Sequence, residues 1–287
     1  MKKVILGSTG FLGTNLLELF KSQGEEVCAL SRLEFTNPNK VLDTIETSCV
    51  IINCIGSANV GISYSNTADD FESNVGVVRG VLEILRKHKL NHVKFINLSS
   101  AAVYGNPTRL PVKETDLIQP LSPYGFHKSM AEVLLKEYSQ CFGLKTLSFR
   151  VFSAYGNGQK KLLFWDLHEM IQKSKDKIVL FGTGNESRDF IHIEDIAQQI
   201  LLGIDHAYFN GESLNVANGV EVKISEVVEL YQKYYPRNFK YEFTGEVRLG
   251  DPLNWCADIS TMTSWGYQQS ISLDRGVERL IEWASKQ

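Results

Sequence analysis

The first residues of the chain predict a buried strand, a glycine-rich turn and a helix in immediate succession. Lys3–Leu6 is a short, mostly apolar run, and the apolar residues of the segment 12–23 recur at helical spacing. Gly7, Gly10 and Gly13 occupy the turn between them. At such a junction the first glycine permits a tight turn, the second lets the backbone approach a pyrophosphate, and the third lets the helix pack on the strand. The N-terminus therefore predicts a dinucleotide-binding site, with the phosphates at the helix start.

Predicted strands and helices alternate along most of the chain. The expected strands are Lys3–Leu6, Glu26–Leu30, Cys49–Ile55, Val93–Leu98, Lys145–Val151 and Leu214–Val216, and the expected helices are Leu12–Gln23, Asn39–Thr47, Asn74–His88, Pro123–Phe142 and Ile193–Gly203. Such alternation predicts an α/β fold, in which a doubly wound parallel sheet forms a Rossmann domain.

The region after Gly156 departs from this rhythm and predicts a smaller α/β domain that binds the substrate. Its expected elements are the helices Leu162–Ser174, Ser225–Tyr234 and Leu273–Ala284 and the strand Ile178–Phe181. We therefore expect a dinucleotide-binding domain of residues 1–155 plus 191–219, and a smaller domain of residues 156–190 plus 220–287.

Tyr124 and Lys128 lie four residues apart in a predicted helix. Positions i and i+4 share one helix face, so the Lys128 ammonium can approach the Tyr124 phenol. A neighbouring positive charge favours phenolate, and we expect it to lower the pKa of Tyr124 from about 10. The pair predicts a group that gives and takes a proton near neutral pH.

Ser99 and Ser100 follow the predicted strand Val93–Leu98. Ligands of an open parallel sheet bind outside the carboxyl ends of its strands. A serine hydroxyl there can hydrogen-bond a substrate oxygen and share a proton with Tyr124. Taken alone, either serine suits a turn cap equally well. Beside the glycines and Tyr124, the serines predict redox chemistry at a carbonyl or carbinol carbon.

The composition argues against several other classes of protein. The chain has 287 residues and a net charge of −3, so no basic surface argues for nucleic acid. No apolar run approaches the roughly 18 residues of a membrane helix, and the first strand leaves no room for a signal peptide. The five cysteines form no CxxC pair, which fits a reducing cytoplasm. His88 and His92 lack further metal ligands nearby in the sequence, so we expect no metal. From the charge, the apolar runs and the cysteines we expect a cytoplasmic protein without nucleic-acid or membrane partners.

Together these motifs resemble the extended short-chain dehydrogenase/reductase family, in its nucleotide-sugar branch of epimerases, dehydratases and reductases. The resemblance covers nearly the whole chain and extends to the segments Gly182–Asp195, Leu214–Asn218 and Val247–Asp251. It implies an NAD(P)-dependent enzyme that acts on a nucleotide-diphosphate sugar, as in polysaccharide biosynthesis. It also implies a homodimer formed through the helices Asn74–His88 and Pro123–Phe142.

The resemblance also implies roles for individual residues. The family's catalytic residues match Ser100, Tyr124 and Lys128. Its cofactor contacts match Gly7, Thr9, Gly10, Phe11, Leu12, Gly13, Ser31, Arg32, Asn74, Tyr124 and Lys128. Its substrate contacts match Ser99, Ser100, Tyr124, Ser153, Arg188 and Arg248. A guanidinium fork suits phosphate oxygens, so the two arginines are expected on the diphosphate. Many relatives carry asparagine where this chain has Ser153.

The end of the second predicted strand bears on the choice of cofactor. NAD-binding sites usually carry an acidic residue there, which binds the ribose 2′-hydroxyl. This chain has Ser31 and Arg32 instead, and Arg32 would attract the 2′-phosphate of NADP(H). We therefore expect NADP(H). NAD is the alternative, with the ribose contact elsewhere, for example at Glu34.

Ala101 and Ala102 narrow the choice of reaction. Dehydratases of the family usually carry an acidic residue here to protonate the leaving hydroxyl, so the two alanines argue against dehydration. The short segment between the second and third strands resembles the 4-keto-6-deoxy sugar reductases. We therefore predict a reductase in which NADPH delivers hydride to a 4-keto-6-deoxyhexose and Tyr124 donates the proton. An NAD-dependent C4 epimerase is the alternative.

Overall fold

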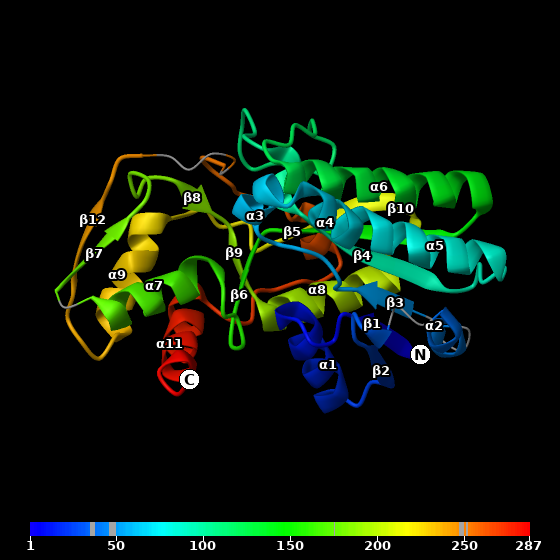
Figure 1. Ribbon diagram of the computed structural model, residues 1–287, viewed down its shortest axis with the longest axis horizontal. Coiled ribbons are helices and arrows are strands. Elements are labelled where there is room, and N and C mark those ends of the chain that lie inside the picture. Colours follow the sequence, from blue (N-terminus) through cyan, green and yellow to red (C-terminus); the bar gives the residue numbers. More distant parts are fainter. Residues whose placement is uncertain (35–37, 46–49, 175, 247–249, 251) are drawn as a thin grey trace.

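The computed structural model of the chain describes residues 1–34, 38–45, 50–174, 176–246, 250 and 252–287. A parallel sheet flanked by helices lies beside a smaller part that contains α7, α9 and α11 (Figure 1). The strands are β1 (Lys3–Leu6), β2 (Val27–Leu30), β3 (Val50–Asn53), β4 (Lys94–Ser100), β5 (Lys145–Val151), β6 (Ser153–Tyr155), β7 (Lys177–Leu180), β8 (Ser187–Arg188), β9 (Phe190–His192), β10 (Asn210–Val216), β11 (Val222–Lys223) and β12 (Lys240–Phe243). The helices are α1 (Phe11–Ser22), α2 (Pro38–Ile45), α3 (Val60–Ser65), α4 (Thr67–Phe71), α5 (Val77–Lys87), α6 (Pro123–Phe142), α7 (Leu162–Lys173), α8 (Ile193–His206), α9 (Ile224–Tyr234), α10 (Ser260–Ser264) and α11 (Leu273–Ala284).

In the part of the chain that the structure describes, six strands form one parallel sheet in the order β10-β5-β4-β3-β1-β2. Lys3 on β1 pairs with Val27 on β2 and with Val50 on β3. The strand order therefore reverses at β1, which makes the carboxyl ends of β1 and β3 a topological switch point. Ligands of doubly wound sheets bind at this place. The predicted fold class, a doubly wound parallel sheet with flanking helices, is confirmed.

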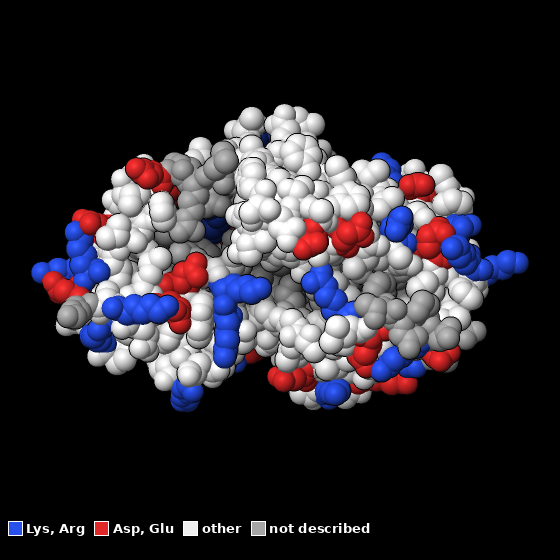
Figure 2. Space-filling view, in the orientation of Figure 1, with Lys and Arg blue, Asp and Glu red and all other residues white. Residues whose placement is uncertain are grey.

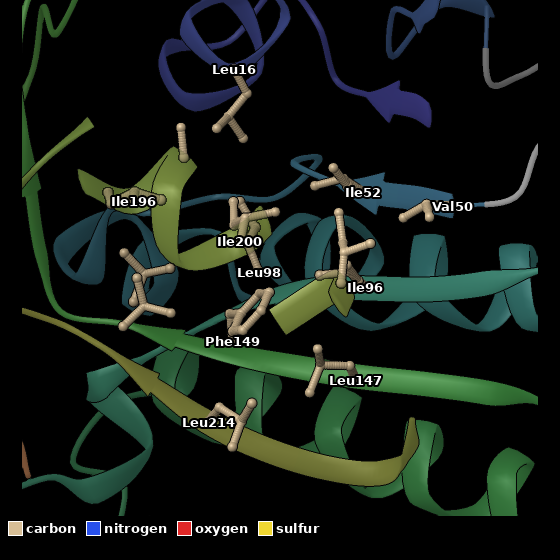
Figure 3. Close-up of a cluster of buried hydrophobic side chains, with 14 of the residues drawn as sticks. Leu16, Val50, Ile52, Ile96, Leu98, Leu147, Phe149, Ile196, Ile200 and Leu214 are labelled. Carbon is tan, nitrogen blue, oxygen red and sulfur yellow. The ribbon is translucent and has the colours of Figure 1, made fainter. Parts of the chain in front are cut away.

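Helices cover both faces of the sheet, with α1 and α8 on one face and α2, α5 and α6 on the other (Figure 1). Figure 3 shows part of the first core, in which Leu16 of α1 and Ile200 of α8 lie near Ile96 and Phe149 of the sheet. These four side chains are fully buried. Burial of one such side chain contributes about 1.5–3 kcal/mol relative to exposure. Strands buried on both faces carry apolar residues nearly continuously, which explains their clear signal in the sequence.

The smaller part has its own core, built by α7, α9 and α11. Tyr155 stacks on Phe164 with 4.9 Å between the ring centroids. Gly276 brings α11 against this pair, because a Cβ at Gly276 would lie only 2.3 Å from the Tyr155 hydroxyl oxygen. The predicted domain boundaries stay a prediction. Met262 and Tyr267, which they assign to the smaller domain, pack in the core beside the sheet.

The predicted elements and the structure agree best where the sequence pattern is long. β1, β5, α6 and α11 have the predicted bounds, whereas the short elements α3, α4 and α10 and several two- to four-residue strands were not predicted. The helix predicted at Asn74–His88 is present as α5, but its first residues belong to a π-helical turn at Glu72–Gly76. Residues 46–49, which two predicted elements include, lie outside the described residues. None of the described helices has the length and apolar character needed to cross a membrane.

Candidate active site

The glycine-rich loop lies at the switch point of the sheet. The Gly7 N–H donates to the Leu30 carbonyl at 2.7 Å, and Gly7 has a φ of +82°, which favours glycine. A Cβ at Gly13 would lie 2.2 Å from the Gly7 carbonyl oxygen, so α1 can pack here only without a side chain. A Cβ at Gly10 would meet no atom closer than 3.5 Å. The protein itself therefore does not require glycine at position 10.

The start of α1 suits the pyrophosphate of a dinucleotide. Gly10 caps this helix and has no side chain, so the cap residue itself leaves the first-turn N–H groups unoccupied. No acidic residue lies in the first turn, where it would repel a phosphate. Thr9 is exposed and Phe11 and Leu12 are half-buried at this end of the helix. The cofactor contacts predicted for these three residues stay predictions. The N–H groups at the start of α1 fit the pyrophosphate of the cofactor.

Two elements bring the predicted catalytic residues together. Ser100 ends β4 and caps the 3-10 turn Ala101–Tyr104, where its hydroxyl oxygen accepts the Ala102 N–H at 3.2 Å. Tyr124 and Lys128 lie in the first two turns of α6. This helix begins with Ser122 as its cap and Pro123 as its first residue, a favourable start for a helix. The parallel sheet and the cap of α6 thus place three polar groups at the carboxyl edge of β4.

The Tyr124 phenol is buried and hydrogen bonded to the Ser100 side chain. Burial raises the pKa of Tyr124 to about 12; the hydrogen bond with Ser100 acts to lower it, and Asp70 raises it further. The prediction that Lys128 lowers this pKa below its ordinary value is therefore wrong for the protein alone. The Lys128 nitrogen lies 5.8 Å from the centroid of the Tyr124 ring, and loss of hydration outweighs the positive charge.

Lys128 occupies a buried pocket beside the third strand. Burial lowers the pKa of Lys128 to about 8, and nearby Asp70 is the largest opposing influence. A Cβ at Gly56, which follows β3, would lie 3.2 Å from the Lys128 nitrogen and 2.8 Å from the Asn74 side-chain oxygen. Asn74 and Lys128 therefore converge on the backbone of Gly56. The Asn74 oxygen is buried and has no hydrogen-bond partner among the described residues, as expected for an atom that meets a ligand or water.

The end of β2 presents charges of both signs. The Glu34 carboxylate accepts the Ser31 N–H at 2.7 Å and pairs with Lys40. Hydrogen bonds from Lys40 and Ser31 lower the pKa of Glu34 to about 2. Arg32 is exposed and donates to the Ser73 hydroxyl. An anion that suits a ribose diol and a cation that suits a phosphate thus lie within three residues of each other.

The Ser99 side chain is hydrogen bonded to a buried ion pair. Its hydroxyl donates to Glu132 at 2.5 Å, and Glu132 also accepts from Arg150 at 2.8 Å. Both charged side chains are nearly fully buried. Ser213 adds a further hydrogen bond to Glu132 at 3.1 Å. The substrate contact predicted for Ser99 stays a prediction.

Arg188, one of the two arginines predicted to bind the substrate diphosphate, lies on β8, away from the glycine loop. Arg188 on β8 donates to the Leu253 carbonyl at 3.2 Å, and its guanidinium carbon lies 5.5 Å from the Trp255 ring centroid. Ser153 begins β6 and is half-buried. Arg248 lies outside the described residues. The surface is hollowed between the sheet and the smaller part (Figure 2), and the contacts of these residues stay predictions.

Sequence reasoning missed Gly56, Asp70 and His127. Gly56 had a usable signal, since a glycine after a buried strand at the switch point permits close approach of a ligand. His127 Nδ1 and Asp70 Oδ2 lie 2.6 Å apart in a buried pair. Their separation of 57 residues along the chain gave no pattern that could reveal it.

A Rossmann sheet with a glycine loop at its switch point and a Ser, Tyr and Lys group beside it defines an enzyme of the extended short-chain dehydrogenase/reductase type. The family model described as the NAD dependent epimerase/dehydratase family matches residues 4–217. The chain belongs to this family, and the resemblance drawn from the motifs is confirmed.

Relatives and solved structures match the chain over nearly its whole length. A UDP-glucose 4-epimerase of Halalkalibacterium halodurans is 25% identical and covers 99% of this chain and 95% of its own. A CDP-paratose 2-epimerase of Salmonella typhi is 26% identical and covers 99% of both chains. The crystal structure of a UDP-glucuronic acid 4-epimerase from Bacillus cereus, in complex with UDP-glucuronic acid and NAD, superposes with a TM-score of 0.87. It is 23% identical and covers 100% of this chain and 99% of its own, which supports the fold.

Proposed function

We propose that the protein is an NAD-dependent epimerase that inverts C4 of a nucleotide-diphosphate sugar. The observation that carries this proposal is the placement of Ser100, Tyr124 and Lys128 together at the carboxyl edge of the sheet, beside the glycine loop. The full-length match to epimerases supports the same reaction class.

In this proposal the nicotinamide cofactor, when bound at the α1 start, supplies the hydride acceptor and donor. Tyr124 takes the O4 proton as C4 is oxidised to a ketone. The keto sugar then rotates in the site. Return of the hydride to the opposite face of C4 would restore the carbinol, and Tyr124 would return the proton to O4. Ser100 hydrogen-bonds that oxygen throughout. Lys128 would contact the nicotinamide ribose and hold it beside Tyr124.

NAD is favoured over NADP(H) by the residues at the end of β2. The Glu34 carboxylate is fixed by the Ser31 N–H, and its low pKa keeps it ionised at neutral pH. An ionised carboxylate accepts hydrogen bonds from a ribose diol and repels a 2′-phosphate. The neighbouring solved structure with NAD bound supports the same choice.

A reductase is the second candidate, and Arg32 is the observation that favours it. The Arg32 guanidinium lies at the end of β2, where the 2′-phosphate of NADPH would meet it. Such an enzyme would consume NADPH and reduce a 4-keto-6-deoxyhexose. Dehydration is disfavoured, because the buried Ala101 and Ala102 offer no acid to the leaving hydroxyl.

We further propose a homodimer formed through α5 and α6. Phe126, Met130 and Val133 recur at helical spacing on α6 and are 50%, 44% and 66% exposed in the single chain. Apolar side chains exposed together on one helix face mark an interaction surface. Val133→Glu would then shift the protein to monomers, measured by light scattering during gel filtration. A wild-type protein of monomer mass would contradict this part of the proposal.

The experiment that tests the function mixes the purified protein with UDP-linked hexoses and hexuronic acids. Proton NMR follows inversion at C4, and absorbance of the reduced nicotinamide follows net consumption of cofactor. The proposal expects interconversion of one sugar pair without net consumption, and NAD released on denaturation. Stoichiometric loss of NADPH with a 4-keto-6-deoxy sugar would instead establish the reductase.

A further inference from the structure

A buried acid and base lie directly behind the proposed catalytic residues. His127 Nδ1 is 2.6 Å from Asp70 Oδ2, and the two residues are 6% and 2% exposed. The Phe71 ring packs edge-on against the His127 ring, with 5.3 Å between centroids. A buried carboxylate is costly unless it is paired and hydrogen bonded. The pair therefore fixes a carboxyl group at this point of the core, and His127 precedes Lys128 directly on α6.

Asn74 links this pair to the pocket of Lys128. The Asn74 side-chain N–H donates to the Asp70 carbonyl oxygen at 3.1 Å. Its oxygen converges with the Lys128 nitrogen on Gly56. Asn74 lies in the π-helical turn Glu72–Gly76, a rare backbone form found mostly at functional sites. The turn thus places Asn74 between α4, which carries Asp70, and the pocket of Lys128.

Asp70 is the carboxylate best placed to balance Lys128. Among the described residues, the titratable groups near the ammonium are Asp70 from α4, Cys54 after β3, and Tyr124 and Glu132 from its own helix. Burial raises the pKa of Tyr124 to about 12, so its phenol is neutral. Burial raises the pKa of Cys54 to about 12, so its thiol is neutral. Glu132 is already paired with Arg150.

The second carboxylate oxygen of Asp70 is buried without a protein partner in the described part of the chain. Asp70 Oδ1 is buried and has no hydrogen-bond partner among the described residues, whereas Oδ2 is held by His127. On α6, the titratable neighbours of Asp70 are His127, Tyr124 and Lys128. The fixed geometry of the pair therefore leaves one carboxylate oxygen facing the interior, where an ammonium or water is the complementary group.

We propose that Asp70, anchored by His127, is a positioning residue whose carboxylate keeps the Lys128 ammonium charged. It acts on the reaction through Lys128 and touches neither sugar nor cofactor. The assignment rests on the proposed function for its catalytic meaning, and its charge effect can be measured without any turnover.

The test follows the titration of Lys128 by NMR in the full-length protein labelled with carbon-13 at the lysine Cε. The Lys128 signal is the one that Lys128→Arg removes. Asp70→Asn keeps the shape and removes the negative charge, so the Lys128 midpoint should fall by about one pH unit. Asp69→Asn is the matched control, because Asp69 is the exposed neighbour and carries the same charge. The control should leave the midpoint in place.

An unchanged Lys128 midpoint in folded Asp70→Asn protein would overturn the assignment. Should that variant fail to fold, Asp70→Ser removes the same charge, leaves room for water and is read in the same way. With a sugar that the enzyme converts, kcat can be measured as a function of pH. Asp70→Asn should then move the alkaline decline of kcat to lower pH and leave the KM for the sugar unchanged. If the Lys128 midpoint shifts in Asp70→Asn but the wild-type protein epimerises no sugar, the role of Asp70 is retained and only the proposed function is rejected.

Discussion

Lys128 on α6 donates a hydrogen bond to the carbonyl oxygen of Leu98 on β4, with 2.8 Å between the two atoms. Leu98 lies two residues before Ser100, so this bond ties the helix that carries Tyr124 to the strand that carries Ser100. An ammonium has three N–H donors, and the bond to Leu98 uses one of them. The geometry of the proposed proton-transfer group is therefore held by two regular elements and not by a loop.

Replacement of Tyr124 by Phe should lower turnover by about 10²–10⁴-fold, because the reaction loses its proton donor and acceptor. Cofactor binding and thermal stability should change little. Tyr138→Phe is the matched control, since Tyr138 lies on the same helix and its hydroxyl donates to Glu83 at 2.6 Å, away from the site. Sugar interconversion by NMR measures both variants. Equal turnover in Tyr124→Phe and the wild type would refute the mechanism.

Alanine substitutions at Gly10 and Gly13 should have different effects: the first should weaken cofactor binding, and the second should lower the stability of the fold. Gly13→Ala places a Cβ 2.2 Å from the Gly7 carbonyl oxygen, and such overpacking costs about 1–3 kcal/mol of unfolding free energy. Gly10→Ala meets no protein atom within 3.5 Å, so its stability should be retained while its affinity for the cofactor falls. Denaturant unfolding and cofactor titration measure the two effects. Wild-type cofactor affinity in Gly10→Ala would argue against a pyrophosphate at this turn.

Glu34 and Arg32 should have opposite effects on cofactor choice. If Glu34 binds the ribose diol, Glu34→Ala weakens NAD binding about tenfold, and Arg32→Ala leaves it nearly unchanged. Calorimetric titration with NAD and NADP gives both affinities. The reverse pattern, with NADP binding lost in Arg32→Ala, would support the reductase.

The reaction rate should fall at alkaline pH, because the proposed role of Lys128 requires its protonated, ammonium form. The pKa of Lys128 is lowered to about 8, so the ammonium is present below that pH and is lost above it. We expect kcat/KM to fall about tenfold per pH unit above the midpoint. Lys128→Arg stays charged at these pH values, so its profile should lack this limb even if its rate is lower. An identical limb in both proteins would assign it to another group.

The Glu132 and Arg150 pair should be required for folding. Arg150→Met leaves the buried Glu132 carboxylate without its partner, at a cost of about 3–5 kcal/mol of unfolding free energy. Lys233→Met removes an exposed partner of Asp274 and should change the stability little. Urea unfolding compares the two. A small effect of Arg150→Met would show that water or another group satisfies Glu132.

Local patterns predicted those parts of the fold that bury long apolar faces. The helix Pro123–Phe142 has the predicted bounds, because its apolar residues recur at helical spacing after the Ser122 and Pro123 start. In the structure, Gly143 ends it in a left-handed conformation. The short helix Thr67–Phe71 and the π-helical form of the turn after it were not predicted, because fewer than two turns give no periodicity. The sequence named Asn74 but not Asp70, so the short, unpredicted helix holds a residue that only the structure brings to the candidate site.

The sequence by itself determined the α/β class, the glycine turn, and the Ser, Tyr and Lys residues of the candidate site, since each depends on neighbours within a few positions. The tertiary structure alone decided which charges meet. It raised the pKa of Tyr124 through burial, joined Ser99 to Glu132 and paired Asp70 with His127. Hydration and pairing depend on distances between segments far apart in the chain, and these distances are set only when the helices close over the sheet.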